Sequence, residues 1–168
     1  NYDQMRYEGF GPNGTSIIVE ALTDNRNRTA SNVRSAFQKF GGSMGETGSV
    51  SHAFNHYGFV RYNKDVTSEE DFFNFSIEGG AEDCFIEEDT YEAVSTPENL
   101  SNLYNYLDKK FGEPVSSGFQ WKPVTYVAIE GDKLKSLINL LNELDNDEDV
   151  QQVFSNFEAS DEELAKFT

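Results

Sequence analysis

Helix-like and strand-like segments alternate along this chain in an order that leaves few folds open. Between residues 58 and 123 the order is β-α-β-β-α-β, preceded by a β-β-α-β segment and followed by a β-α-β segment. Antiparallel strand pairs combined with helices indicate the α+β class, with helices covering one face of each sheet. We therefore predict two small α/β-sandwich (ferredoxin-like) domains, in which an inserted domain at 58–123 interrupts a discontinuous domain made of 1–57 and 124–158. Residues 159–168 are expected to form a frayed acidic tail.

Residues typical of helix N-termini mark where the helices are expected to begin. Thr29 is the expected N-cap of the first helix. Thr67 and Glu70 have the spacing of a capping box, which indicates a second helix. Thr96 is followed by Pro97, and proline is favoured in the first turn of a helix, so a third helix is expected there.

The stretch "GFGPNG", residues 9–14, fits the dinucleotide-binding pattern G-x-G-x-x-G. That pattern holds a pyrophosphate only where it joins a strand to the N-terminus of a helix. Here the β-branched residues Ile17, Ile18 and Val19 follow and favour a second strand. Pro12 also removes a backbone N–H that a phosphate loop would use. We therefore predict a turn between antiparallel strands, with no nucleotide or other cofactor bound.

The composition limits the class of protein. Hydrophobic residues make up 37% of the chain, which is enough for a packed core and argues against general disorder. The single cysteine, Cys84, excludes an internal disulfide framework and fits a reducing compartment such as the cytoplasm. No apolar run approaches the ~20 residues of a membrane span, so no membrane contact is expected.

The charge of −17 is distributed unevenly. Residues 1–64 hold seven basic and five acidic groups, whereas residues 65–168 hold six basic and twenty-five acidic groups. An acidic surface repels a phosphate backbone, so the second region is not expected to bind nucleic acid directly. Any phosphate contact is expected in the first region, and the chain alone is expected to bind nucleic acid weakly.

Three segments together resemble the YebC/PmpR family: "YEGFGPNGTSIIVEALTDNRNRT", "FGGSMGETGSVSHAF" and "DVQQVFSNFE". Their order and spacing match essentially the whole chain. The resemblance implies a fold of three domains, of which the first is helical and basic and the third is inserted into the second. From the resemblance we expect this chain to comprise the second and third domains without the N-terminal one. His52, in "SHAF", stands where many relatives carry an apolar aromatic pair, so it is assigned no role.

The resemblance also implies a function. It indicates a transcriptional regulator that controls gene expression by binding DNA, mainly through the missing basic domain. The alternative is a translation factor that acts at the ribosome through RNA and protein contacts. A further hypothesis is that the acidic region docks onto a basic protein partner. The sequence shows no nucleophile–base pair and no set of metal ligands, so we expect the protein not to be an enzyme.

The candidate nucleic-acid-binding residues are Arg26, Arg28, Arg34 and Lys39. Arginines at a helix start face the positive end of the helix dipole, and such an unfavourable placement suggests phosphate capture. The alternative is an ordinary solvated face. In that case Arg28 pairs with Asp24 and Arg34 hydrogen-bonds to Gln38.

Other candidate sites are weaker. The glycine-rich segment 41–50 is either a flexible loop with backbone N–H groups open to RNA or protein, or a structural turn that requires positive φ. His52 and His56 do not lie on a convincing helix, so no metal site is expected. The adjacent acids 87–89 cannot all face one point and indicate a solvated acidic edge.

Overall fold

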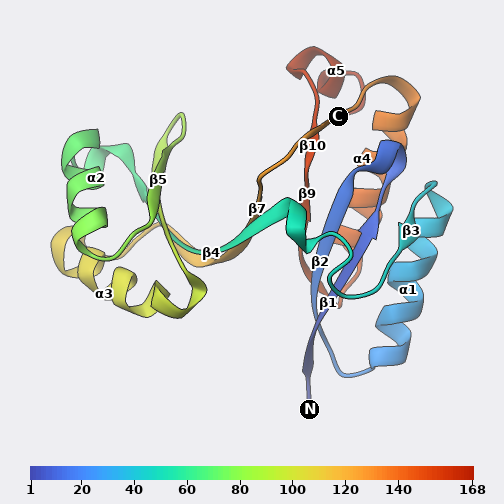
Figure 1. The fold of residues 1–168 in the computed structure, drawn as a ribbon, viewed down its shortest axis with the longest axis horizontal. Coiled ribbons are helices and arrows are strands. Elements are labelled where there is room, and N and C mark those ends of the chain that lie inside the picture. Colours follow the sequence, from blue (N-terminus) through green and yellow to red (C-terminus); the bar gives the residue numbers. More distant parts are fainter. The chain divides into compact units, whose positions relative to one another are not determined.

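The computed structural model describes residues 1–168 and divides them into two units (Figure 1). The first unit combines residues 1–55 with 122–168, and the second is the continuous segment 56–121. The chain is a mixed α/β protein with antiparallel sheets and five α-helices, in agreement with the class predicted from the sequence. None of the helices is both long and apolar enough to cross a membrane.

The first unit is built on a four-stranded sheet of order β3-β1-β2-β9. Its strands are antiparallel neighbours, and β1 and β2 pair in register from Asp3↔Thr23 to Phe10↔Ser16. A separate parallel pair joins β8 to β10. The strands are β1 (Asp3–Phe10), β2 (Ser16–Thr23), β3 (Ser43–Met44), β8 (Val127–Ala128), β9 (Val150–Ser155) and β10 (Phe157–Glu158), and the helices are α1 (Arg26–Lys39), α4 (Gly131–Asn146) and α5 (Asp161–Ala165).

Helices α1 and α4 pack against the same face of this sheet. Alternate residues of β2 point to that face and are buried with one side of each helix. The buried apolar residues that β1, β2, α1 and α4 contribute are Tyr7, Ile17, Val19, Ala21, Val33, Ala36, Phe37, Leu134, Leu137, Leu140 and Leu144. The core of the unit therefore lies between the sheet and its two long helices.

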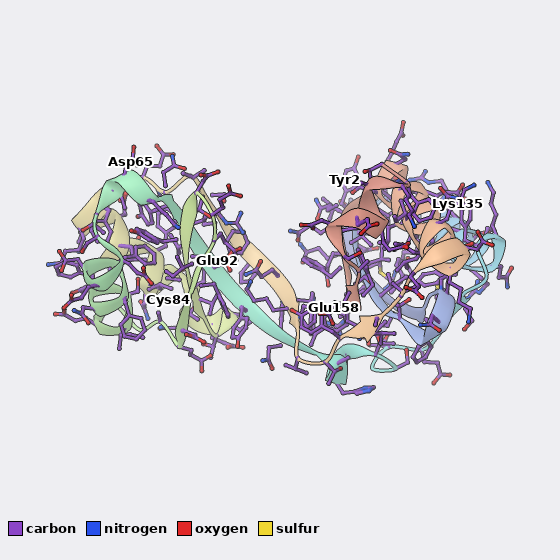
Figure 2. The ribbon with its side chains drawn as sticks, turned by 90° about the horizontal axis from the view of Figure 1, so that it is seen from above. Tyr2, Asp65, Cys84, Glu92, Lys135 and Glu158 are labelled. Atoms are coloured by element: carbon purple, nitrogen blue, oxygen red, sulfur yellow. The ribbon has the colours of Figure 1, made fainter.

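The second unit has a sheet of order β5-β6-β4-β7 with two helices on one face. Cys84 pairs with Ala93 on the helix-covered face, whereas Glu92 pairs with Arg61 on the opposite face (Figure 2). The strands are β4 (Phe54–Asn63), β5 (Asp83–Ile86), β6 (Thr90–Ser95) and β7 (Ser116–Pro123), and the helices are α2 (Glu69–Glu78) and α3 (Leu100–Phe111). Single 3-10 turns occupy Pro12–Gly14, Ser51–Ala53, Lys64–Val66 and Pro97–Asn99.

Two of the expected helix starts were wrong. Helix α1 is capped by Asn25, whose side-chain oxygen accepts the N–H of Arg28 at 3.0 Å. Thr29 is instead a buried residue inside the helix. Helix α2 is capped by Ser68 and not Thr67, because the Ser68 hydroxyl accepts the N–H of Asp71. Asparagine and serine are stronger N-caps than threonine. Asn25 lies four residues before Thr29, and Ser68 lies directly after Thr67.

The expectation of a frayed tail was also wrong. Residues 161–165 form α5, and the Ser160 side chain caps it by accepting the N–H of Glu163. Leu164 and Phe167 pack against the core of the first unit. Two apolar side chains are enough to fix this segment despite its three acidic residues, because burial of apolar area outweighs weak surface repulsion.

The predicted turn at residues 9–14 is confirmed. It joins the antiparallel strands β1 and β2 through one 3-10 turn, in which Asn13 adopts a left-handed φ of 64°. Gly9 is needed for packing at this point. A Cβ atom there would lie 2.7 Å from the Phe37 ring and 2.7 Å from the carbonyl oxygen of Ser43. The first glycine of the motif thus lets α1 and β3 approach the strand closely.

We predict that Gly9→Ala destabilises the first unit by about 1–3 kcal/mol, because one added methyl group overpacks a rigid site. The change is measured by urea denaturation followed by circular dichroism. Ser35→Ala, at an exposed position of α1, is the control and should leave the unfolding midpoint nearly unchanged. A Gly9→Ala protein as stable as this control would contradict the packing role.

Candidate nucleic-acid and protein interfaces

Arg28 lies in the first turn of α1 and is held by two carboxylates. Its Nη2 atom lies 3.0 Å from Asp24 and 2.9 Å from Asp149, and its Nε donates to Asp149 at 3.1 Å. Asp149 also accepts the hydroxyl of Thr29 at 2.7 Å. The Thr29 hydrogen bond and then Arg28 hold the pKa of Asp149 below its usual value, while these carboxylates raise the pKa of Arg28. The pairing with Asp24 considered from the sequence is therefore present.

The other three candidate cations differ in their surroundings. The Arg26 Nε atom lies 3.8 Å from Asp3 in an exposed pair. Lys39 forms an ion pair with Glu143 at 3.0 Å. Arg34 is exposed and forms no ion pair, and the alternative hydrogen bond to Gln38 is not present.

The four cations do not converge on one place. Arg26 and Lys39 lie at opposite ends of α1, about 20 Å apart along the axis. Because each helical residue turns by about 100°, Arg26 and Arg28 project to nearly opposite sides. Arg34 is the one member of the set whose charge no carboxylate offsets. Phosphate binding by these residues stays a prediction, and the geometry favours Arg34 and Arg26 over Arg28 and Lys39.

The glycine-rich segment 41–50 does not offer its N–H groups freely. Glu8, fully buried on β1, accepts the backbone N–H of Gly48 at 2.9 Å, Val50 at 3.0 Å and Ser51 at 2.7 Å. Arg6 donates its Nε to the same carboxylate at 3.2 Å. Burial opposes ionisation of Glu8, but the three N–H groups and Arg6 outweigh it and hold the pKa below its ordinary value. The segment is a structural turn bound to a carboxylate.

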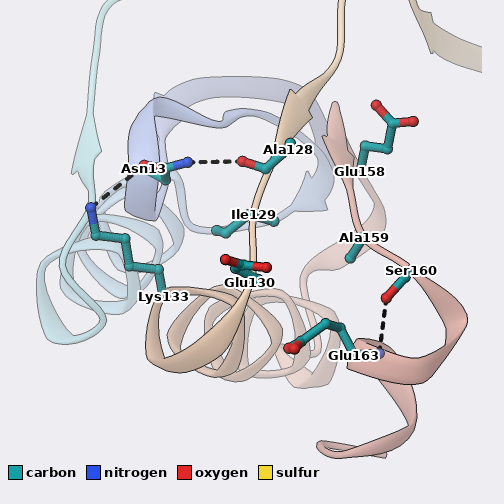
Figure 3. Close-up of a pocket in the computed structure, with 9 residues that line it drawn as sticks. All are labelled: Asn13, Ala128, Ile129, Glu130, Lys133, Glu158, Ala159, Ser160 and Glu163. Carbon is teal, nitrogen blue, oxygen red and sulfur yellow. Dashed lines mark hydrogen bonds between the residues drawn. The ribbon is translucent and has the colours of Figure 1, made fainter.

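A groove of about 730 Å³ lies beside the 9–14 turn in the first unit (Figure 3). Asn13 spans one side of it, donating its Nδ2 to the Ala128 carbonyl at 2.9 Å. The lining also contains three carboxylates, Glu130, Glu158 and Glu163, against one lysine, Lys133. The N–H of Gly131, at the start of α4, is already accepted by Glu163 at 3.2 Å. This acidic lining disfavours a phosphate ligand.

A second groove, of about 490 Å³, lies in the unit 56–121 between α2 and β5. It is lined by Phe73, Cys84 and Ile86 with Glu69 and Glu70. Burial raises the pKa of the Cys84 thiol, so the thiol is neutral at physiological pH and contributes apolar surface. This surface was not predicted from the sequence.

Comparison with known proteins places the chain in a family. The model of the TACO1/YebC second and third domain matches residues 2–157. The chain belongs to the TACO1/YebC family. This agrees with the resemblance seen in the sequence.

A solved structure has a similar fold and sequence. This TACO1/YebC chain is similar to a conserved hypothetical protein, Aq1575, from Aquifex aeolicus, with a TM-score of 0.84 and 37% identical residues. The match covers 95% of this chain and 66% of that protein. The chain therefore spans just under two thirds of the length of that relative.

Three features of this TACO1/YebC chain were missed from the sequence. Asp149 lies 121 residues from Arg28, and only the fold brings them together. Glu8 stands in an alternating strand, where a carboxylate is normally solvated. The α2–β5 groove had one usable signal, since Phe73 and Ile77 are four residues apart beside the buried position Phe72.

We predict that Glu8→Gln lowers the free energy of unfolding by about 1–3 kcal/mol at pH 7, because an uncharged amide cannot accept all three loop N–H groups. The pKa of Glu8 is lowered in the fold, so its contribution is complete above the ordinary glutamate pKa. It is lost as the pH falls through the lowered value, and the wild type and the variant should therefore converge in acid.

Urea denaturation between pH 7 and pH 3 measures both effects. Glu46→Gln, an exposed acid of the same segment, is the matched control and should follow the wild type throughout. Equal stability of Glu8→Gln and the control at pH 7 would show that the loop does not depend on this carboxylate.

Proposed function

We propose that this chain is part of a gene-expression factor of the TACO1/YebC family that acts at the ribosome, in the cytoplasm, by binding rather than by catalysis. The domain 56–121 contributes contacts to basic protein surfaces there. One observation carries the proposal: residues 65–108 contain thirteen acidic and no basic side chains. Such a field repels free nucleic acid and attracts basic protein segments.

The internal pairing of basic groups supports the same role. Arg28 and Lys39 are offset by carboxylates, and the N–H groups of Gly48, Val50 and Ser51 are taken by Glu8. Counterion release from phosphates requires unpaired cations, and of the four candidate residues only Arg34 has no carboxylate partner. This surface therefore fits a factor that binds a ribosome, where RNA is complexed with basic proteins, better than a factor that binds free duplex DNA.

A ribosome-binding assay tests the proposal. The chain should co-sediment with purified ribosomes at about 0.15 M salt and should not shift a DNA duplex in a gel under the same conditions. An unrelated acidic protein of similar size is the control for trapping. If the chain stays in the supernatant and retains duplex DNA tightly, the proposed site of action is wrong.

DNA binding by a transcriptional regulator is the second candidate function. It is favoured by Arg34, which has no carboxylate partner, and by the loosely paired Arg26. These two residues would serve as auxiliary phosphate contacts within a longer protein whose main contact lies elsewhere.

Under this second candidate, the double variant Arg26→Gln/Arg34→Gln should weaken binding to all sequences alike. The slope of log K against log salt should fall by about 0.7–0.9 for each phosphate that the variant no longer neutralises. Lys135→Gln, an exposed lysine of α4 shown in Figure 2, is the matched control for charge removal. Fluorescence anisotropy with labelled DNA and RNA over a salt series measures the slope. An unchanged slope would leave Arg26 and Arg34 as solvated side chains.

A further inference from the structure

The groove between α2 and β5 exposes an unusual amount of apolar surface for such an acidic domain. Phe73 is 46% exposed, Ile77 is 43% exposed and Ile86 is 40% exposed. Phe73 and Ile77 are one turn apart on α2, whereas Cys84 and Ile86 lie on the helix-facing side of β5. Phe73, Cys84 and Ile86 line the groove itself, and the exposed Ile77 lies one turn further along α2. We call these four residues the apolar strip. Clustered exposed apolar residues of this kind mark interaction sites more often than scattered ones do.

The rim of this strip carries uncompensated negative charge. Glu69 and Glu70 line the groove and form no ion pair. The basic residues nearest in sequence are Lys64 and Lys109, because none lies between them. An apolar floor with acidic edges complements a ligand that has an apolar face flanked by Lys or Arg.

The charge also excludes other occupants. Segment 56–121 holds fourteen acidic and four basic residues, so a second copy of this domain would meet strong like-charge repulsion. A nucleic acid or an anionic membrane would be repelled for the same reason. Strand addition to the edge strand β5 is hindered because the N–H of Cys84 is already accepted by the Asp83 carboxylate at 2.8 Å. A helix laid into the groove needs no such backbone donor.

We propose that the α2–β5 groove binds a basic amphipathic helix of a protein partner. The apolar face of that helix packs on Phe73, Ile77 and Ile86, and its Lys or Arg side chains meet Glu69 and Glu70. This inference rests on the proposed function, which gives the domain a role in protein contact. It adds the place and the chemical class of the contact.

A defined peptide tests the groove. The probe is a fluorescein-labelled helix of about 18 residues, five turns, with leucines on one face and lysines on the other. A peptide of the same composition with a scrambled order has no apolar face and is the control. Anisotropy titration of the whole chain should show binding of the amphipathic peptide about tenfold tighter than that of the scrambled one.

Matched variants separate the groove from general electrostatics. Phe73→Ser should weaken binding about tenfold. Val115→Ser changes an apolar residue of the same unit that is even more exposed (58%), and should change binding less than about twofold. Glu69→Gln/Glu70→Gln should weaken binding and reduce its salt dependence. Glu87→Gln/Glu88→Gln removes the same charge from the β5–β6 hairpin and should have little effect. Circular dichroism checks that each variant is folded.

Equal effects of the two glutamate pairs, or of Phe73→Ser and Val115→Ser, would overturn the groove assignment. A dimer in the ultracentrifuge that Phe73→Ser dissolves would also overturn it, because a second copy would then be the occupant. The peptide assay contains no ribosomes. Loss of peptide binding with retained co-sedimentation therefore rejects the groove alone, and the opposite pattern rejects the site of action alone.

Discussion

A single buried carboxylate organises one face of the first unit. Glu8 lies on the sheet face opposite the core helices, and its neighbour on β2 is the fully buried Ile18. Three backbone N–H groups and Arg6 satisfy its charge. The three N–H donors, Gly48, Val50 and Ser51, belong to the segment between α1 and β4. Strand β4 is where the chain enters residues 56–121. A buried charge without these partners would be too costly to keep, so carboxylate and loop must order together.

The same use of charge recurs in other parts of the chain. Asp149 joins the end of α4 to the start of α1 by accepting Arg28 and Thr29. Glu92, almost fully buried in the second unit, accepts Arg61 at 2.5 Å and Gln120 at 3.0 Å. Cations are scarce in this chain, and several of them are used to satisfy structural carboxylates. Each such pair removes one cation and one carboxylate, so acidic residues make up a larger share of the charges that remain free. A basic protein partner therefore fits this surface better than a phosphate backbone does.

Sequence periodicity was sufficient to predict the four longer helices, and the turn residues with the β-branched run that follows them were sufficient for the 9–14 turn. The family was predicted from the resemblance of three segments and not from periodicity. The Arg28–Asp24 pair could also be predicted, because the two residues are only four positions apart at the start of α1, with Asp24 just ahead of the Asn25 cap. Asp149 and Glu8 could not, because their partners are 121 and up to 43 residues away. The caps failed where two candidate residues competed within one turn, as with Asn25 and Thr29. The prediction of a frayed tail was wrong because it gave weight to the acidic residues, whereas the packing of Leu164 and Phe167 on the core decides the structure there.

The central claim is that the hydrogen bonds of Glu8 and Asp149 keep their donor groups from binding phosphates, and NMR spectroscopy tests it directly. Short RNA and DNA oligonucleotides are titrated into the ¹⁵N-labelled chain at about 0.15 M salt, where screening acts over roughly 8 Å. The amides of Gly48, Val50 and Ser51 and the Nε–H of Arg28 should keep their NMR chemical shifts, because Glu8 and Asp149 hold them. Saturable shifts of these four signals would show that phosphates displace the carboxylates, and would contradict the assignment of these groups to structure.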